Sequence, residues 1–61
     1  MVQFIVSGRD KLGQRIVLWR RGEYQYEIET TAKDGRTLSM RFGKEYYDAL
    51  DMFEKMAVTV N

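Results

Sequence analysis

The chain has 61 residues, of which ten are basic and nine acidic, and it contains no cysteine, histidine or proline. A chain of this length holds one hydrophobic core and buries roughly 60% of the surface that its unfolded form exposes. Without cysteine and histidine it lacks disulfides, the commonest zinc ligands and the side chains on which most nucleophilic and acid–base catalysis depends. We therefore predict a single domain over residues 1–61, not an enzyme, with no cofactor and no metal site.

Apolar stretches along the chain are short. The longest, Ile16 to Trp19, is far below the roughly 20 residues that cross a bilayer. Residues 1–8 lack the leading positive charge of a secretory signal. These features predict a cytoplasmic protein with no membrane segment.

Glycines divide the first two-thirds of the chain into segments rich in β-branched and aromatic residues, a pattern typical of strands joined by turns. We predict four strands, at residues 2–7, 14–20, 24–31 and 36–42. After Gly43 the apolar residues recur at helical spacing, which predicts an amphipathic helix from about Lys44 to Ala57. Its apolar stripe is Tyr46, Ala49, Leu50, Phe53, Met56 and Ala57. Residues 58–61 are expected to fray or to form a short extended tail.

The fold class that follows is α+β, a four-stranded antiparallel meander in the order ββββα with the C-terminal helix packed on one face. In the last hairpin, a three-residue loop ending at Gly35 places one apolar face on the two strands. That loop pairs Tyr26 with Phe42, Ile28 with Met40, and Thr30 with Leu38, and it sets Glu27 opposite Arg41. A two-residue turn would instead put the apolar residues on the side of Glu27, so the pattern favours the longer loop.

Register in the preceding hairpin is less constrained. A three-residue loop over residues 20–22, with Gly22 in the left-handed position, pairs Leu18 with Tyr24 and Ile16 with Tyr26. A shift by one residue would turn Val17 and Trp19 toward the helix instead. We favour the first register because Gly22 suits the left-handed position.

Four consecutive large apolar residues, Ile16 to Trp19, suggest a second apolar surface. Alternate residues of a strand point to opposite faces, so two of the four lie away from the helix. In the favoured register these are Val17 and Trp19, joined by Ile5. Sheet curl and long arginine and glutamine side chains could cover them, or the face could bind a protein partner or a second copy of the chain. The candidate partner-binding residues are Arg15, Val17, Trp19, Arg20, Arg21, Gln25 and Arg41.

Nucleic acid is the alternative partner. Residues 1–22 carry five basic residues and one acidic residue, whereas residues 44–61 carry two basic and four acidic. The folded molecule should therefore be electrically polar, with a basic N-terminal half that could contact phosphates while Trp19 stacks on bases. The arginines expected to serve this purpose are Arg15, Arg20, Arg21, Arg36 and Arg41.

Two glutamates share a face of the third strand. Glu27 and Glu29 could be described as paired carboxylates, but neutralisation across strands by Arg41 or Arg15 explains them without catalysis. We therefore assign them no catalytic role.

The segment GEYQYEIETTAKDGRTLSMRF, followed by a helix that contains DALDMFEKM, resembles the three strands and helix of AP2-like domains, which include the arm-binding domains of phage-type integrases. The shared features are a glycine before an aromatic strand, a DG turn, a phenylalanine that closes the last strand and an alanine inside the helix. The resemblance covers residues 22–57. It implies a sheet that binds the DNA major groove, with Gln25, Glu27 and Arg41 facing the DNA. The small size of the chain further suggests an origin in a phage or mobile element.

These features together predict a small binding or regulatory module. It would act on a protein partner, or on a second copy of itself, through the sheet face around Trp19. The alternative is a nucleic-acid-binding protein that uses the basic N-terminal half and the same sheet face.

Overall fold

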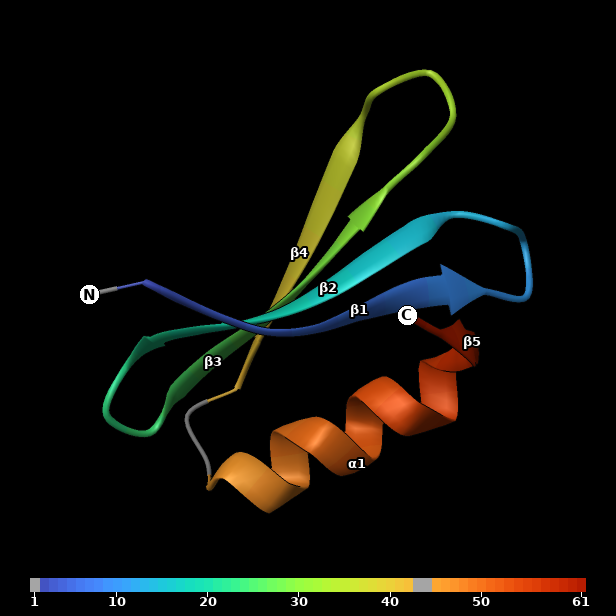
Figure 1. Ribbon diagram of the computed structural model, residues 1–61. Coiled ribbons are helices and arrows are strands. Elements are labelled where there is room, and N and C mark those ends of the chain that lie inside the picture. The colour runs from blue at the N-terminus through green and yellow to red at the C-terminus, as the bar shows by residue number, and fades with distance from the viewer. Residues whose placement is uncertain (1, 43–44) are drawn as a thin grey trace.

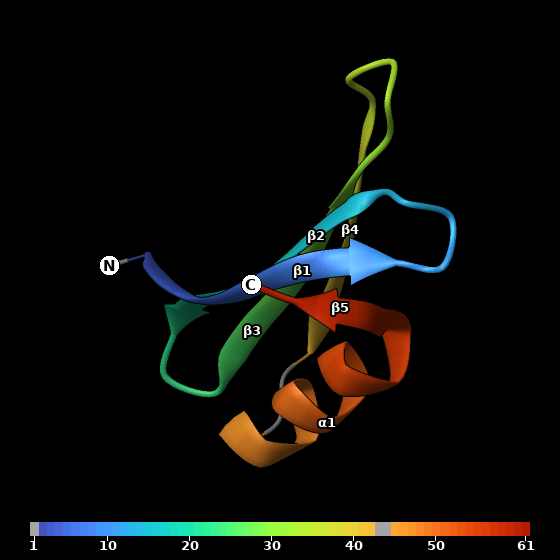
Figure 2. The ribbon, with the colours of Figure 1, turned by 45° about the vertical axis from the view of Figure 1, so that its right-hand side comes forward.

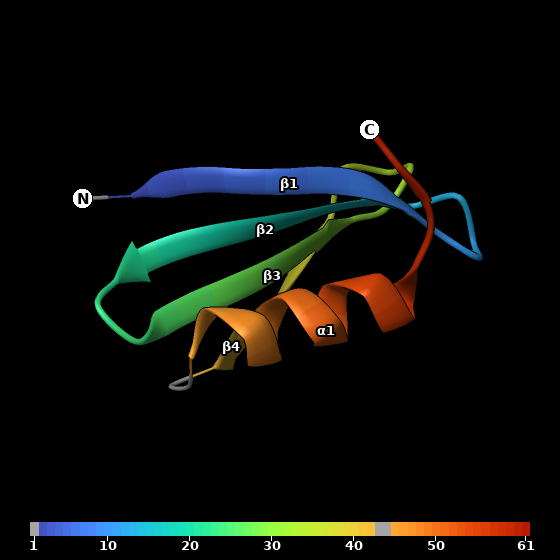
Figure 3. The ribbon, with the colours of Figure 1, turned by 60° about the horizontal axis from the view of Figure 1, so that its bottom comes forward.

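The computed structural model describes residues 2–42 and 45–61. Within these residues the chain forms an α+β fold of five strands and one helix (Figure 1). Along the chain the elements are β1 (Gln3–Asp10), β2 (Arg15–Gly22), β3 (Gln25–Thr31), β4 (Thr37–Phe42), α1 (Tyr46–Met56) and β5 (Ala57–Val60). The strands make one antiparallel sheet in the order β4-β3-β2-β1-β5, and α1 packs against one side of it (Figure 3). We call this side the helix side and the opposite side the open face.

The predicted α+β class is confirmed, but the prediction of four strands misses the return of the chain to the sheet after the helix. The backbone turns extended at Ala57 and runs as β5 beside β1, pairing Gly8 with Val60 (Figure 2). The amide of Asn61 donates to the carbonyl of Ser7 at 2.9 Å. Gly8 permits this close approach, because a Cβ added there would lie 2.2 Å from the carbonyl oxygen of Thr59. Residues 58–60 therefore form most of an edge strand, and Asn61 adds one backbone hydrogen bond beyond its end.

Register in the β3–β4 hairpin agrees with the prediction. Tyr26 pairs with Phe42, Ile28 with Met40, and Glu27 with Arg41. The three-residue loop is closed by the amide of Ala32, which donates to the carbonyl of Arg36 at 2.8 Å. Gly35 has a φ of 90°, the left-handed conformation that the loop requires.

The predicted register of the β2–β3 hairpin is wrong by four residues. Leu18 pairs with Ile28 rather than with Tyr24, because β2 continues through Gly22 and the turn falls on residues 23–24. Tyr24, not a glycine, takes the positive φ of 58° in this turn. The longer strands align Ile16 and Leu18 with the buried part of β3. Since four is an even number, the shift leaves every side chain of β2 on its predicted face.

The core lies between α1 and the helix side of the central strands. Ile16, Leu18, Ile28 and Phe53 are all less than 2% exposed, and Ala49 is fully buried beside them. Leu50, Met56 and Ala57 of the predicted helical stripe are partly buried against this cluster. Tyr46, by contrast, is 38% exposed and contacts the ring of Tyr26 with centroids 6.2 Å apart.

The helix is shorter than predicted and begins at Tyr46, with Glu45 at its N-cap position and without a side-chain capping hydrogen bond. The predicted start at Lys44 lies outside the described residues. The helix α1 has 11 residues. The described part of the chain contains no helix that is long and apolar enough to span a membrane.

Candidate binding surface on the open sheet face

The open face is built from three rows of side chains that cross the central strands. Cross-strand pairing aligns one residue from each of β1, β2, β3 and β4 in every row. The first row is Phe4, Trp19, Glu27 and Arg41. The second is Ser7, Val17, Glu29 and Ser39, and the third is Arg9, Arg15, Thr31 and Thr37.

Glu27 lies at the centre of the first row and is only 3% exposed. Arg21 donates to its Oε1 atom from Nε at 3.2 Å and from Nη2 at 2.5 Å, and Arg41 donates to its Oε2 atom at 3.3 Å. The hydrogen bond from Arg21 has the largest effect on the pKa of Glu27, and it lowers that pKa. Together with the bond from Arg41 it outweighs burial, which raises the pKa, so the pKa of Glu27 lies below its ordinary value of 4.5. The carboxylate therefore stays ionised and ties β2, β3 and β4 together. The expected neutralisation by Arg41 is present, whereas Arg15 pairs with Thr31 and Arg21 supplies the main contact.

An aromatic–arginine cluster, formed by Phe4, Trp19 and Arg21, adjoins this carboxylate. The rings of Phe4 and Trp19 meet edge to face with centroids 5.9 Å apart, and the guanidinium carbon of Arg21 lies 5.9 Å from the Trp19 ring centroid. Phe4 is 53% exposed, and Trp19 is partly buried beneath its neighbours. Its Nε1 atom is buried and has no hydrogen-bond partner in the described structure. The cluster thus presents Phe4 to solvent on a half-buried tryptophan.

The centre of the open face is sealed by the chain itself. Val17 lies on this face as predicted, but it is only 5% exposed and is out of reach of a partner. The expectation that Ile5 joins this face is wrong. A register irregularity between Phe4 and Val6 changes the alternation of β1, so that Ile5 packs against the helix-side core and Phe4 pairs with Trp19. Neighbouring side chains therefore bury the apolar residues in the middle of the open face, but they leave Phe4 exposed.

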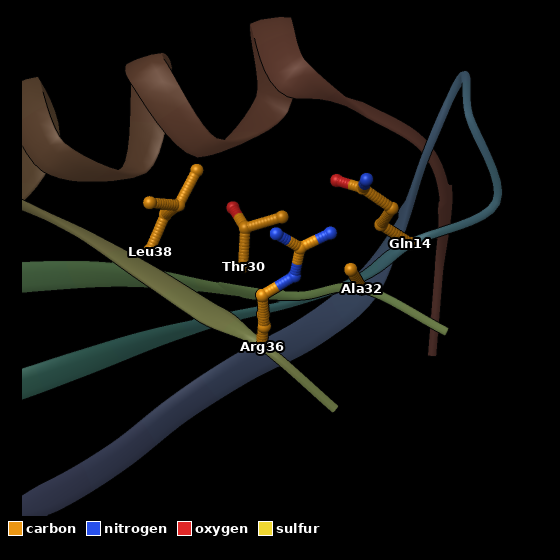
Figure 4. A pocket seen from close by; sticks show the side chains of 5 residues that line it. All are labelled: Gln14, Thr30, Ala32, Arg36 and Leu38. Atoms are coloured by element: carbon orange, nitrogen blue, oxygen red, sulfur yellow. The ribbon is translucent and has the colours of Figure 1, made fainter. Parts of the chain in front are cut away.

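The structure brings six of the seven predicted binding residues to the open face and leaves one on the other side. Arg15, Val17, Trp19, Arg21, Gln25 and Arg41 alternate onto the open face of β2, β3 and β4. Arg20 instead pairs with Tyr26 on the helix side, where its Nε atom donates to the carbonyl of Gly22 at 3.4 Å. Arg36, expected to contact phosphates, also lies on the helix side, in line with Leu38 (Figure 4).

Two members of the surface, Phe4 and Arg9, were missed by sequence reasoning. Phe4 could not be placed because a bulge has no simple sequence signal. Arg9 was missed because the first strand was predicted to end at Ser7, whereas β1 continues to Asp10. Positions 8–10 are a glycine and two charged residues, so they show no alternation of apolar and polar residues from which the end of the strand could be predicted.

Arg9 and Arg15 form a directly opposed pair of like charges on β1 and β2. Such a pair destabilises a sheet unless an anion lies nearby. Within residues 2–42 and 45–61, neither arginine takes part in an ion pair, and Arg9 only donates to the carbonyl of Gly13 at 3.0 Å. Both side chains are exposed. The third row is therefore a cationic strip without compensating carboxylates.

The outer side of α1 is acidic. The charged solvent-facing residues of the helix and its N-cap are Glu45, Asp48, Asp51, Glu54 and Lys55. Of these, Lys55 is the one base, and it bonds Asp51 at 3.0 Å. Carboxylates therefore line the outer side of α1, whereas the open face carries Arg9, Arg15, Arg21 and Arg41 together with Glu27 and Glu29.

Comparison with known proteins finds no matching family model, no similar curated protein and no similar solved structure. The resemblance to AP2-like domains therefore stays a prediction. Within the described residues, no group of three or more acidic side chains is placed to hold a metal ion.

Proposed function

We propose that the chain is a small non-enzymatic binding module whose aromatic–arginine cluster contacts a protein partner. The observation that carries this proposal is the exposure of Phe4, which is 53% exposed while packed edge to face on Trp19. Aromatic residues and arginines dominate the energetics of protein interfaces. A phenylalanine held in place by a neighbouring ring loses little conformational freedom when a partner covers it.

Arg21 and Arg41 add polar specificity to this cluster. Both bond the buried carboxylate of Glu27, which holds the Arg21 guanidinium beside the Trp19 ring and the Arg41 guanidinium on the far side of the carboxylate. The side chain of Arg41 remains 85% exposed, so its other donors are free to reach a carboxylate or carbonyl of a partner. The proposed surface is therefore an exposed ring next to pre-oriented hydrogen-bond donors.

The experiment compares capture of a partner by the wild-type chain with capture by two single-ring variants. Phe4→Ala removes the exposed ring of the cluster, whereas Tyr47→Ala removes a 76% exposed ring on the outer side of α1. A protein identified by mass spectrometry should be lost with Phe4→Ala and kept with Tyr47→Ala. Chemical-shift changes in the labelled chain on adding that protein should map to β1 and β2. Equal capture by both variants, or shifts confined to the helix, would refute the proposal.

Nucleic acid is the second candidate partner, and the opposed pair Arg9 and Arg15 is the observation that favours it. Two exposed arginines facing each other without a carboxylate form a site that a phosphate would stabilise. Thr31 and Thr37 continue the same row with hydroxyl groups that could also contact the backbone of a nucleic acid.

The test is binding of duplex and single-stranded DNA at several salt concentrations. The double variant Arg9→Ala/Arg15→Ala should weaken binding and reduce the slope of log affinity against log salt by about 2. The control Arg20→Ala/Arg36→Ala removes the same charge from the helix side and should leave most of the slope. If neither form of DNA binds at low salt, or if both double variants lose the same slope, a phosphate site on the open face is excluded.

A further inference from the structure

β4 is an edge of the sheet, and the helix leaves its apolar side chains uncovered. Leu38 is 77% exposed and Met40 is 47% exposed, and both point to the helix side in register with Thr30 and Ile28. A hollow of about 250 Å³ lies beside Leu38 and continues to Gln14 on the neighbouring turn (Figure 4). Leu38 and Met40 therefore form an exposed apolar strip on the helix side of β4, beyond the part of the sheet that α1 covers.

The backbone of β4 offers free hydrogen-bonding groups along the same edge. The carbonyl of Arg36 accepts from Ala32, so residue 36 directs its backbone groups toward β3. Because these groups alternate along an antiparallel strand, Thr37, Ser39 and Arg41 direct theirs away from the sheet. Natural edge strands are usually protected by charged side chains, proline, a bulge or a short length. Residues 37–40 carry no charge and no proline, and their pairing with β3 shows no bulge; Arg41 is the one charged residue of β4. β4 is also longer than the other edge, β5, by two residues.

The edge is complementary to itself. If two β4 strands pair antiparallel about Ser39, Leu38 meets the partner's Met40 and the outward backbone groups pair directly. Arg36 then lies opposite the end of the partner's β4, which leads into the partner's helix. Its side chain is on the helix side, where the carboxylates of Glu45 and Asp48 begin that helix. Arg36 bonds Asp34 of its own hairpin through Nε at 2.7 Å, and its 87% exposed side chain keeps its other donors for the acidic start of the partner's helix. The arrangement occurs twice, once on each side of the twofold axis.

We propose that the chain forms a twofold dimer by antiparallel pairing of β4 with β4 of a second copy. The axis is perpendicular to the sheet, so the two sheets become one and both helices lie on the same side. Apolar contact between Leu38 and the partner's Met40 supplies the burial, and the pairing of Arg36 with the acidic helix start sets the register. The proposal is independent of the proposed binding function, because it uses the edge of the sheet and the helix side.

The first test is sedimentation of the purified chain over a wide concentration range, with lysine placed at either edge. Leu38→Lys should weaken the dimer by about tenfold or more, because it removes a leucine that the dimer would bury and places a charged side chain against the partner's Met40. Val58→Lys alters a 67% exposed valine on β5 and should leave the dimer unchanged. A strictly monomeric wild-type chain, or loss of the dimer with Val58→Lys but not with Leu38→Lys, would overturn the proposal.

Two further sets of variants test the backbone pairing and the charges. Ser39→Pro removes an amide that the β3–β4 ladder does not use and should abolish the dimer, whereas Ser39→Ala should keep it. Circular dichroism of Ser39→Pro reports whether the monomer stays folded. Arg36→Glu and Asp48→Lys should each weaken the dimer, and the double variant should recover it. If Leu38→Lys dissociates the dimer but the double variant does not recover it, the assigned register is wrong.

Discussion

The buried carboxylate of Glu27 makes the open face sensitive to one substitution, Arg21→Met. Methionine keeps much of the volume of the arginine stem but removes two hydrogen bonds to Glu27 and the guanidinium beside Trp19. Hydrogen bonds to a charged group contribute about 1.5–3 kcal/mol, and removing one partner of a buried pair costs about 3–5 kcal/mol. Arg41 remains to compensate Glu27, so we expect the lower range, about 2–3 kcal/mol. A domain of this size has a total stability of about 3–9 kcal/mol, so the loss is large.

Urea unfolding followed by the fluorescence of Trp19 measures this cost. The matched control is Arg41→Met, because Arg41 makes one longer bond to the same carboxylate and its side chain is 85% exposed. An exposed ion pair contributes at most about 1 kcal/mol, so the control should lose far less stability than Arg21→Met. Equal losses in the two variants would refute the assignment of Arg21 as the main partner of Glu27.

The same substitution changes how stability depends on pH. The pKa of Glu27 is lowered in the folded protein, so on acidification the unfolded chain takes up the proton first. This contribution to stability is therefore complete above the ordinary pKa of 4.5 and is lost as the pH falls through the lowered pKa. In Arg21→Met the pKa of Glu27 should rise, which moves the folded-state protonation to higher pH. Titration of the Glu27 carboxyl by NMR tests this, and an unchanged pKa in the variant would contradict it.

Three further substitutions test other parts of the fold. Gly8→Ala should displace β5 and speed amide exchange at Asn61, whereas Gly22→Ala, whose added Cβ meets only the flexible end of Gln25, should not. Tyr24→Asn should raise the free energy of unfolding by about 0.5–1 kcal/mol, as measured by urea titration, because asparagine tolerates the positive φ at this 59% exposed position. Phe53→Ala empties the fully buried centre of the core and should cost about 3–5 kcal/mol, enough to unfold much of the protein at room temperature by circular dichroism.

Sequence periodicity predicted those parts of the fold in which hydrophobic alternation is regular. The β3–β4 register follows from Gly35 and from the alternation of Leu38 and Met40, since a two-residue turn would place these side chains on the face of Glu27. The β2–β3 register did not follow, because Gly22 looked like a turn residue and the protein places Tyr24 in the left-handed conformation instead. The faces of β2 were still predicted correctly, because the error was an even number of residues.

The candidate site was predicted where it depends on β2 and β3, and missed where it depends on β1. The irregular register between Phe4 and Val6 places Phe4 on the open face where Ile5 was predicted. Nothing in the alternation of residues 2–7 marks this irregularity. The pairing of β5 with β1 is likewise nonlocal, and it carries β1 past the predicted end at Ser7 to include Arg9. Both missed residues therefore depend on contacts that a local pattern does not contain.

Pairing of two β4 edges would also change what the open face can bind. A twofold axis perpendicular to the sheet keeps both open faces on the same side, so the dimer presents two copies of the Arg9 and Arg15 strip on one continuous sheet. A long partner such as a nucleic acid can engage both strips, and the second contact then forms at a high effective concentration. A compact protein that covers one Phe4 gains no such advantage. Leu38→Lys should therefore weaken the binding of long DNA, because a monomer offers one strip instead of two. It should leave the affinity of each Phe4 surface for a protein partner unchanged.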